Sequence, residues 1–196
     1  MFNQGKSLGR QFFHVQDYLI SLCESTHAKG GSVWFLGRDC DVFHGALKES
    51  QPNVRYIAGL NRVNARKLQN RNRLTKWLKT IGVRPGDVLV DSGFNGSIYS
   101  RIEEDNPKFF GSIRCTLITA NPDGHCGEPL MPESTTNGKL RNAVLALEHS
   151  PKREVSEWDY DRRLPSVSKL DGKAGETARS FYKGFIAAIK EGEKCK

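Results

Sequence analysis

The chain has 196 residues, of which 37% are hydrophobic, and a formal net charge of +8. This length suits one domain with a buried core, and no apolar run reaches the roughly 18 residues that a membrane-spanning helix needs. The first residues lack the apolar segment of a secretory signal, and the five cysteines lack the spacing of a disulfide framework. These features argue against a membrane-embedded or disulfide-stapled protein. They predict a single domain over 1–196 in a reducing, cytoplasmic compartment.

Apolar spacing divides the chain into alternating helices and strands. Helices are expected over 8–27, from 41 onward, over 64–81, over 97–104 and from 178 onward. Strands are expected over 33–37, 54–58, 88–90, 112–119 and 143–147, with a long loop over 121–139. Asp41 and Ser97 have the short polar side chains of helix N-caps. The alternation predicts an α/β fold: a doubly wound, mostly parallel five-stranded sheet with helices on both faces, a core over 33–149 and a C-terminal extension over 150–196.

The positive charge is concentrated in one segment. No acidic residue lies between 61 and 86, and this segment holds eight basic residues: Arg62, Arg66, Lys67, Arg71, Arg73, Lys76, Lys79 and Arg84. The other twenty-two of the thirty Lys and Arg balance the twenty-two Asp and Glu. Such a segment fits an anionic partner, either a phosphorylated small molecule or a nucleic acid, although a solvated helix face has the same pattern.

Polar residues follow three of the expected strands, at 37–39, 59–62 and 91–93. Ligands of open parallel sheets bind at these carboxyl ends. In the third case an apolar strand runs into Asp91, and a turn with Gly93 and Gly96 precedes the next helix. Glycines permit positive φ and close backbone approach, and the amide groups at a helix start attract anions. The segment 86–101 therefore predicts an anion-binding corner.

This corner resembles the ribose-phosphate loop of type I phosphoribosyltransferases. In that family a hydrophobic strand runs into two acids, and a Thr-Gly-containing loop opens a helix. The resemblance implies that Asp91 holds ribose hydroxyls, while this chain has Ser92 at the position of the second acid. The implied phosphate-binding and ligand-binding residues of the corner are Ser92, Gly93, Asn95, Gly96 and Ser97.

The same resemblance assigns a diphosphate-binding loop to the end of the first strand, at Gly37, Arg38 and Asp39. It places the basic segment in the region of the family's mobile catalytic hood. Arg38 and a basic residue such as Arg62 would neutralise a diphosphate leaving group, while Mg²⁺ bridges diphosphate and ribose oxygens. The implied ligand is phosphoribosyl diphosphate or a nucleotide, and the implied reaction is transfer of a ribosyl-phosphate group. Asp91, Arg38 and Asp39 are the implied catalytic residues.

Two other functions fit the same sequence. The apolar strand that ends in Asp39-Cys40-Asp41 resembles the first motif of haloacid dehalogenase-type phosphatases. That resemblance implies Asp39 as nucleophile, Asp41 as general acid/base, and Mg²⁺ held by the two carboxylates. A binding module without catalysis would instead use the basic segment 62–84 to follow the backbone of a nucleic acid.

Overall fold

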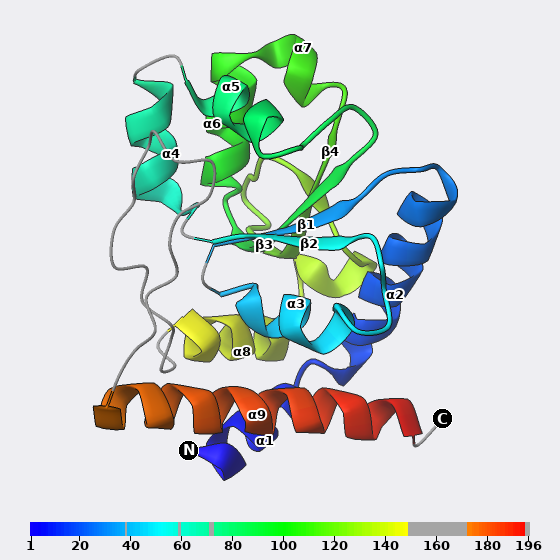
Figure 1. Ribbon diagram of the computed structural model, residues 1–196, viewed down its shortest axis with the longest axis vertical. Helices are drawn as coiled ribbons and strands as arrows, with labels where there is room; N and C mark the ends of the chain where they lie inside the picture. The colour runs from blue at the N-terminus through cyan, green and yellow to red at the C-terminus, as the bar shows by residue number, and fades with distance from the viewer. Residues whose placement is uncertain (38, 59, 71–72, 149–171, 195–196) are drawn as a thin grey trace.

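The computed structural model describes residues 1–37, 39–58, 60–70, 73–148 and 172–194 (Figure 1). Five strands form one sheet: β1 (Val33–Leu36), β2 (Val54–Ile57), β3 (Val88–Phe94), β4 (Arg114–Ala120) and β5 (Glu128–Pro129). Their order across the sheet is β2-β1-β3-β4-β5, and every neighbouring pair is parallel. This architecture confirms the predicted doubly wound α/β fold.

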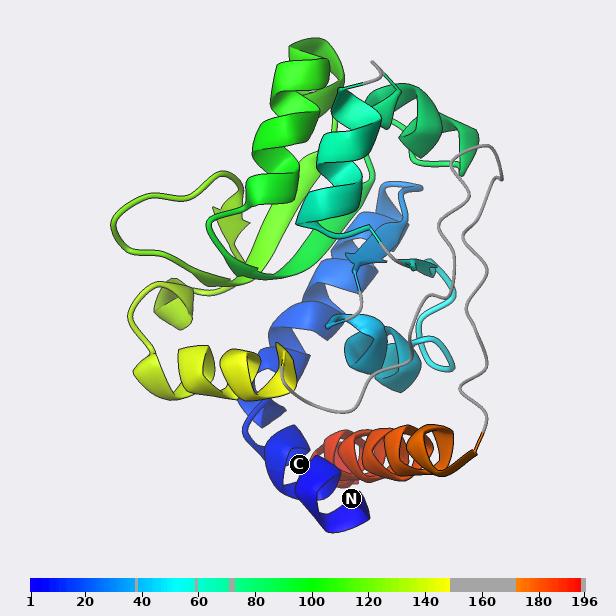
Figure 2. The same cartoon turned by 90° about the vertical axis from the view of Figure 1, so that its left-hand side faces the viewer.

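Helices cover both faces of the sheet (Figure 2). One face packs against α1 (Phe2–Arg10), α2 (Phe13–Ala28), α3 (Asp41–Leu47), α8 (Gly138–Glu148) and α9 (Gly172–Lys194). The other face packs against α4 (Arg62–Gln69), α5 (Leu74–Thr80), α6 (Ser97–Asp105) and α7 (Pro107–Phe110). The terminal helices α1 and α9 lie side by side in both views. None of the described helices is both long and apolar enough to cross a membrane.

The sequence of β1 explains the two layers. Side chains alternate between the faces of a strand, so Val33 and Phe35 join the core under α2, α3 and α8. Trp34 and Leu36 point the other way and join the core under α4, α5 and α6. All four side chains are buried, as expected for a central strand covered on both faces.

Two helices that were expected to be continuous are each broken. The predicted helix over 8–27 is α1 and α2, because α1 turns to pack closely on α9: a Cβ at Gly5 would lie 2.0 Å from the carbonyl oxygen of Phe181. The predicted helix over 64–81 is α4 and α5. Leu68 and Leu74 are both fully buried but six residues apart, about 120° around one continuous helix. The break lets both face the sheet.

The predicted strand over 143–147 is wrong, because these residues form part of α8. Its buried side chains recur at helical spacing: Leu140, Ala143, Val144 and Leu147. The apolar residues over 143–147 resemble a strand only when Leu140, one helical turn earlier, is left out of the pattern. The fifth strand is the short β5, within the stretch expected to be a loop, and that stretch also contains the 3₁₀ helix η1 (Pro132–Ser134). The last helix begins at Gly172, six residues earlier than expected.

Tyr99 of α6 ties the helix layer to the sheet. Its ring is fully buried, and its hydroxyl lies 3.0 Å from the carbonyl oxygen of Leu89 and 2.8 Å from that of Thr116. We expect Tyr99→Phe to lower the free energy of unfolding by about 1 to 2 kcal/mol, because the two carbonyls lose a shared donor in a buried place. Urea denaturation measures this, and Tyr18→Phe on the exposed side of α2 is the control. Equal effects of the two changes would show that the hydroxyl contributes nothing.

Candidate functional site at the switch point of the sheet

The strand order creates a crevice between β1 and β3. From β1 the chain crosses through α3 to β2 on one side, and from β3 it crosses through α6 and α7 to β4 on the other side. At such a switch point the two connections leave on opposite faces, which opens a crevice beyond the carboxyl ends of the strands. Asp39 follows β1, and Asp91 is the middle residue of β3, because the strand predicted over 88–90 continues to Phe94. The structure therefore brings two of the three predicted catalytic residues to one place in the fold.

The turn from β3 into α6 has an unusual backbone. Gly93, Phe94 and Gly96 have positive φ angles of 140°, 70° and 62°. Gly96 is the N-cap of the nine-residue α6, in the left-handed conformation, and no side chain among the described residues caps it. The predicted N-cap Ser97 is instead the first helical residue. The first amide groups of α6 thus have no partner from their own helix or from a cap, which suits an anion.

Close packing explains why both glycines are required. A Cβ at Gly93 would lie 2.2 Å from the carbonyl oxygen of Thr119, and a Cβ at Gly96 would lie 1.7 Å from that of Cys126. The second contact comes from the loop that follows β4. Gly93 and Gly96 were predicted correctly as places of close backbone approach. The group that approaches each glycine is protein backbone, so Gly93 and Gly96 also have a structural role in holding the turn.

The loop over 121–127 is fastened to this turn. The amide of Asn121 donates to the carbonyl oxygen of Phe94 at 2.8 Å, and the amide of Cys126 donates to that of Asn95 at 3.1 Å. The side-chain amide of Asn121 also donates to Asn95 Oδ1 at 3.2 Å. Sequence reasoning missed Asn121 as part of the site. The signal that could have found Asn121 was its position directly after β4. It is a fourth polar residue that follows a strand at the same edge of the sheet.

Cys40 is fully buried between β1 and α3, and two carboxylates act on its thiol. Burial raises the pKa of its thiol well above the ordinary value, and the carboxylates of Asp91 and then Asp39 raise it further. Backbone groups of Leu36 in β1 and Ser92 in β3 contact the thiol and oppose this rise. One side chain is thus in contact with both strand ends. Asp39 and Asp91, from different strands, both act on it.

A second polar group lies on the β2 side of the crevice. Burial raises the pKa of the Tyr56 hydroxyl, and the carboxylates of Asp41 and Asp39 contribute to the rise. The His44 ring stacks on the Tyr56 ring, with 5.3 Å between centroids and 21° between planes. The carbonyl oxygen of Asp41 accepts a hydrogen bond from Tyr182 of α9. Asp41 is the first residue of α3, and Cys40 occupies the N-cap position, so the prediction of Asp41 as N-cap is wrong.

The remaining predicted residues lie near the ends of β1 and β2 or outside the described part of the chain. Gly37 directly follows β1 and has a φ of 65°. A Cβ there would lie 3.2 Å from the carbonyl oxygen of Leu60, so the segments that follow β1 and β2 are in close contact. Arg62 begins α4 two residues later and is exposed. Asn61 accepts a hydrogen bond from the Asn64 amide at 2.9 Å and caps α4. Arg38 lies outside the described residues, so its predicted role stays a prediction.

The described residues contain no group of three or more His, Cys, Asp or Glu side chains that could hold a metal ion. A Mg²⁺ ion bound together with a phosphorylated ligand needs only one or two protein carboxylates, because phosphate oxygens and water complete its coordination. In the candidate site, Asp39 after β1 and Asp91 in β3 would be these carboxylates.

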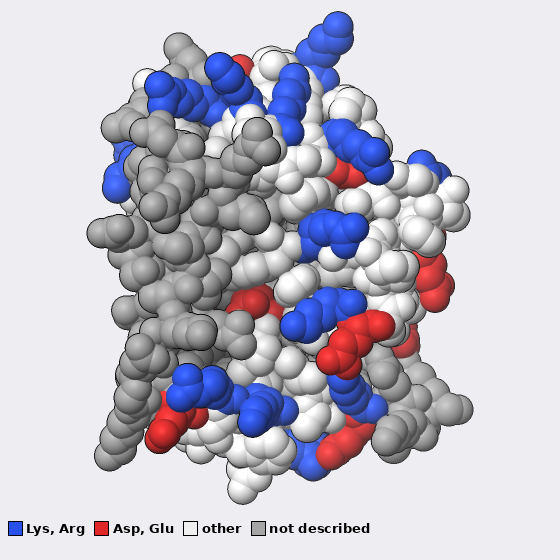
Figure 3. All heavy atoms as spheres, in the orientation of Figure 1, with Lys and Arg blue, Asp and Glu red and all other residues white. Residues whose placement is uncertain are grey.

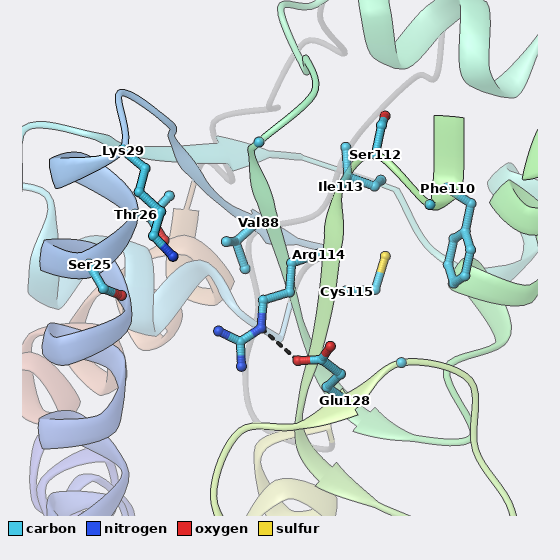
Figure 4. A pocket seen from close by; sticks show the side chains of 13 residues that line it. Ser25, Thr26, Lys29, Val88, Phe110, Ser112, Ile113, Arg114, Cys115 and Glu128 are labelled. Carbon is cyan, nitrogen blue, oxygen red and sulfur yellow. Dashed lines mark hydrogen bonds and ion pairs between the residues drawn. The ribbon is translucent and has the colours of Figure 1, made fainter. Parts of the chain in front are cut away.

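A pocket of about 650 Å³ lies at the opposite edge of the sheet, near the beginning of β3 and β4 (Figure 4). Val88, Ile113 and Phe110 give it apolar walls, and the guanidinium of Arg114 pairs with Glu128 at 2.7 Å. This pocket contains none of the predicted site residues. Its arginine is already neutralised by a carboxylate, so it offers less to an anion than the start of α6 does.

Raised pKa values predict that the fold weakens at alkaline pH. Burial raises the thiol pKa of Cys23 to about 12 and also raises the thiol pKa of Cys40 and Cys115. In the unfolded chain these thiols ionise from about pH 8.5 upward, while in the folded chain they stay protonated, so the free energy of unfolding falls as pH rises. We expect a loss of about 0.8 kcal/mol per thiol between pH 7 and 9, measured by urea denaturation. A stability that is constant or rising over this range would contradict the expectation.

Comparison with known proteins does not place the chain in a family: no protein-family model matches it, and no curated protein is significantly similar to it in sequence.

Proposed function

We propose that this protein binds a phosphorylated sugar or nucleotide, such as phosphoribosyl diphosphate, in the crevice between β1 and β3. The observation that carries the proposal is the start of α6. Its amide groups are left without a side-chain cap, and α6 follows the strand that carries Asp91, whose carboxylate acts together with that of Asp39 on the buried Cys40 thiol. Positive amides beside paired carboxylates match a ligand that carries both phosphate and hydroxyl groups.

Each residue then has a chemical role. The amides of Gly96 and Ser97, with the Ser97 hydroxyl, bind the phosphate of the ligand. Asp91 accepts hydrogen bonds from ribose hydroxyls, and Asp39, from the neighbouring strand, takes the part of the second acid that Ser92 does not supply. In this arrangement one acid lies in β3 and the other follows β1, whereas the phosphoribosyltransferase pattern has two acids that are consecutive in the sequence.

The proposed reaction is transfer of the ribosyl-phosphate group. The bond between the anomeric carbon and the diphosphate oxygen breaks, the diphosphate leaves with the bonding electrons, and a nucleophilic acceptor forms the new bond to that carbon. Asp91 and Asp39 stabilise the positive charge that develops on the ribose, and the exposed Arg62, the first residue of α4, neutralises the departing diphosphate. Mg²⁺, when bound, supplies further positive charge at the diphosphate.

Calorimetric titration with phosphoribosyl diphosphate and Mg²⁺ tests this function. We expect binding by the wild type and at least about a tenfold loss of affinity in Asp91→Asn, since a hydrogen bond to a charged group contributes about 1.5 to 3 kcal/mol. Glu24→Gln, an equal loss of charge on the exposed side of α2, should bind like the wild type. Failure of the wild type to bind, or equal binding by Asp91→Asn, would rule the proposal out.

A phosphatase is the second candidate, because Asp39 and Asp41 lie two residues apart in the connection from β1 to α3, and both carboxylates contribute to the raised pKa of the Tyr56 hydroxyl. In that reaction Asp39 attacks the phosphorus atom, the alcohol leaves with a proton from Asp41, and water then hydrolyses the aspartyl phosphate. Magnesium-dependent release of phosphate from a generic phosphate ester, abolished by Asp39→Asn and unchanged in Glu24→Gln, would favour this reaction over ribosyl transfer.

A further inference from the structure

The helices α4 and α5 present a surface rich in positive charge. We define the basic surface as Arg66 and Lys67 of α4, Arg73 at the start of α5, and Lys76 and Lys79 of α5, all of which are exposed. Figure 3 shows Lys and Arg side chains gathered at the upper end of the molecule, over the part where α5 and α7 lie in Figure 1. Lys108 of α7 is also exposed there.

The cations of this surface differ from other cations of the molecule in their partners. Elsewhere Lys6 pairs with Glu191, Arg114 with Glu128, and Lys190 with Glu49. Within the described part of the chain, by contrast, Arg66, Lys67, Lys76 and Lys79 form no ion pair with a carboxylate. Lys79 lies 5.0 Å from the centre of the Phe109 ring, a contact that leaves its charge in place.

The nearest acids already have other partners. Glu104 accepts a hydrogen bond from the side chain of Gln69, and Asp105 accepts one from the backbone amide of Thr75 at 2.9 Å. These contacts join α4 and α5 to α6. The acids therefore serve to hold the helices in position, while Arg66, Lys67, Lys76 and Lys79 are exposed to solvent.

The surface is carried on a well-packed support. Leu68, Leu74 and Leu78 are fully buried beneath it, so each cation extends from a helix whose other side is fixed to the sheet. A hollow of about 540 Å³ between α5 and the start of α7 is lined by Lys76 and Lys79, and also by Asp105, whose carboxylate accepts the hydrogen bond from the Thr75 amide. Thr75 also lines it, and the buried Thr75 hydroxyl oxygen has no hydrogen-bond partner. Two ammonium groups beside such a hollow suit an entering phosphate.

The surrounding residues favour a nucleic acid over a protein or a membrane. Among the described residues, Val63 is the one exposed large hydrophobic side chain on α4 and α5. A stable protein interface has an apolar centre, and a membrane-binding helix has an apolar face, so neither partner is well matched. A chain of phosphates needs only repeated cations and polar side chains. Here the exposed Asn70 provides such a polar side chain between the cations of α4 and α5.

We propose that the basic surface binds the phosphate backbone of RNA or DNA, without reading the bases. This activity is separate from the ligand site at the switch point, which uses Arg62 and the residues of β1 and β3. Non-specific binding of this kind has dissociation constants of about 10⁻⁴ to 10⁻⁶ M at physiological salt and weakens steeply as salt increases.

Fluorescence anisotropy with a labelled single-stranded RNA and a labelled DNA duplex, at several salt concentrations, tests the proposal. The first variant combines Arg66→Gln, Lys67→Gln and Lys76→Gln. The control combines Lys48→Gln, Lys139→Gln and Lys183→Gln, which remove the same charge from exposed positions on other helices. We expect the first variant to lower the slope of log K against log salt by about 2 to 3 and the control to keep the wild-type slope.

Three results would overturn the proposal. The wild type could fail to bind either nucleic acid at about 50 mM salt. The control could lose as much affinity as the first variant, which would show a general effect of net charge. A polyglutamate chain could displace the nucleic acid as effectively as unlabelled RNA does, which would show a site for any polyanion. Thermal unfolding checks that both variants are folded, and unchanged RNA binding by Asp91→Asn would show that the two sites are independent.

Discussion

Gly96→Ala is expected to lower the free energy of unfolding by at least about 3 kcal/mol. The new methyl group would lie 1.7 Å from the carbonyl oxygen of Cys126, which is backbone and can move only if the whole loop over 121–127 moves with it. Gly96 also has a φ of 62°, where an alanine costs about 1 to 2 kcal/mol by itself. The two effects add, because relieving the contact would require the turn itself to change.

The matched control is Gly30→Ala at the end of α2. Gly30 has a φ of 74°, but a Cβ there would meet nothing within 4 Å. We expect this variant to lose only the cost of the left-handed conformation, about 1 kcal/mol. Urea denaturation of both variants separates backbone strain from the contact with the loop. If Gly96→Ala lost no more stability than Gly30→Ala, the loop would not be fastened to the turn as described.

Asp87→Ala is the second change with a large expected effect, about 3 kcal/mol in the free energy of unfolding. Asp87 lies just before β3 and is only 1% exposed. Its carboxylate accepts hydrogen bonds from the Ser32 amide at 2.8 Å, the Trp34 indole at 2.9 Å and the Arg84 amide at 3.0 Å. Removing it leaves three donors unsatisfied at the place where β1 and β3 begin, which is costly in a buried site.

Asp87→Asn serves as the comparison, because the amide keeps the shape and one accepting oxygen but loses the charge. We expect it to retain part of the stability that alanine loses. Chemical denaturation followed by tryptophan fluorescence is well suited, since Trp34 is one of the donors. A loss below about 1 kcal/mol for alanine would show that water replaces the carboxylate and that it does not tie the two strands.

The fold was largely predictable because its strands are covered on both faces. A continuous apolar run such as the one in β1 is a local signal of a buried strand. The alternation of such runs with segments of helical apolar spacing is a local signal of an α/β fold. The predictions that failed depended on contacts between distant segments of the chain. The break between α1 and α2 contains neither Gly nor Pro and follows from the packing of α1 on α9. The two-residue β5 is too short to have a periodicity of its own.

The candidate site was predictable in its parts but not in its assembly. Asp39 and Asp91 were recognised from their positions after apolar strands, and the strand order then brought them to one crevice. The central position of Cys40 could not be inferred, because it depends on the register of β1 against β3. The role of Asn121 depends likewise on a loop that folds back from β4 onto the turn.

The most direct test of the central claim is an NMR titration that follows the backbone amides while phosphoribosyl diphosphate and Mg²⁺ are added. We expect the largest chemical-shift changes at Asp91 to Ser97 and at Asp39 to Asp41, in β3 and after β1. The absence of changes there, or changes concentrated around Lys29 and Arg114 in the pocket at the opposite edge of the sheet, would contradict the claim.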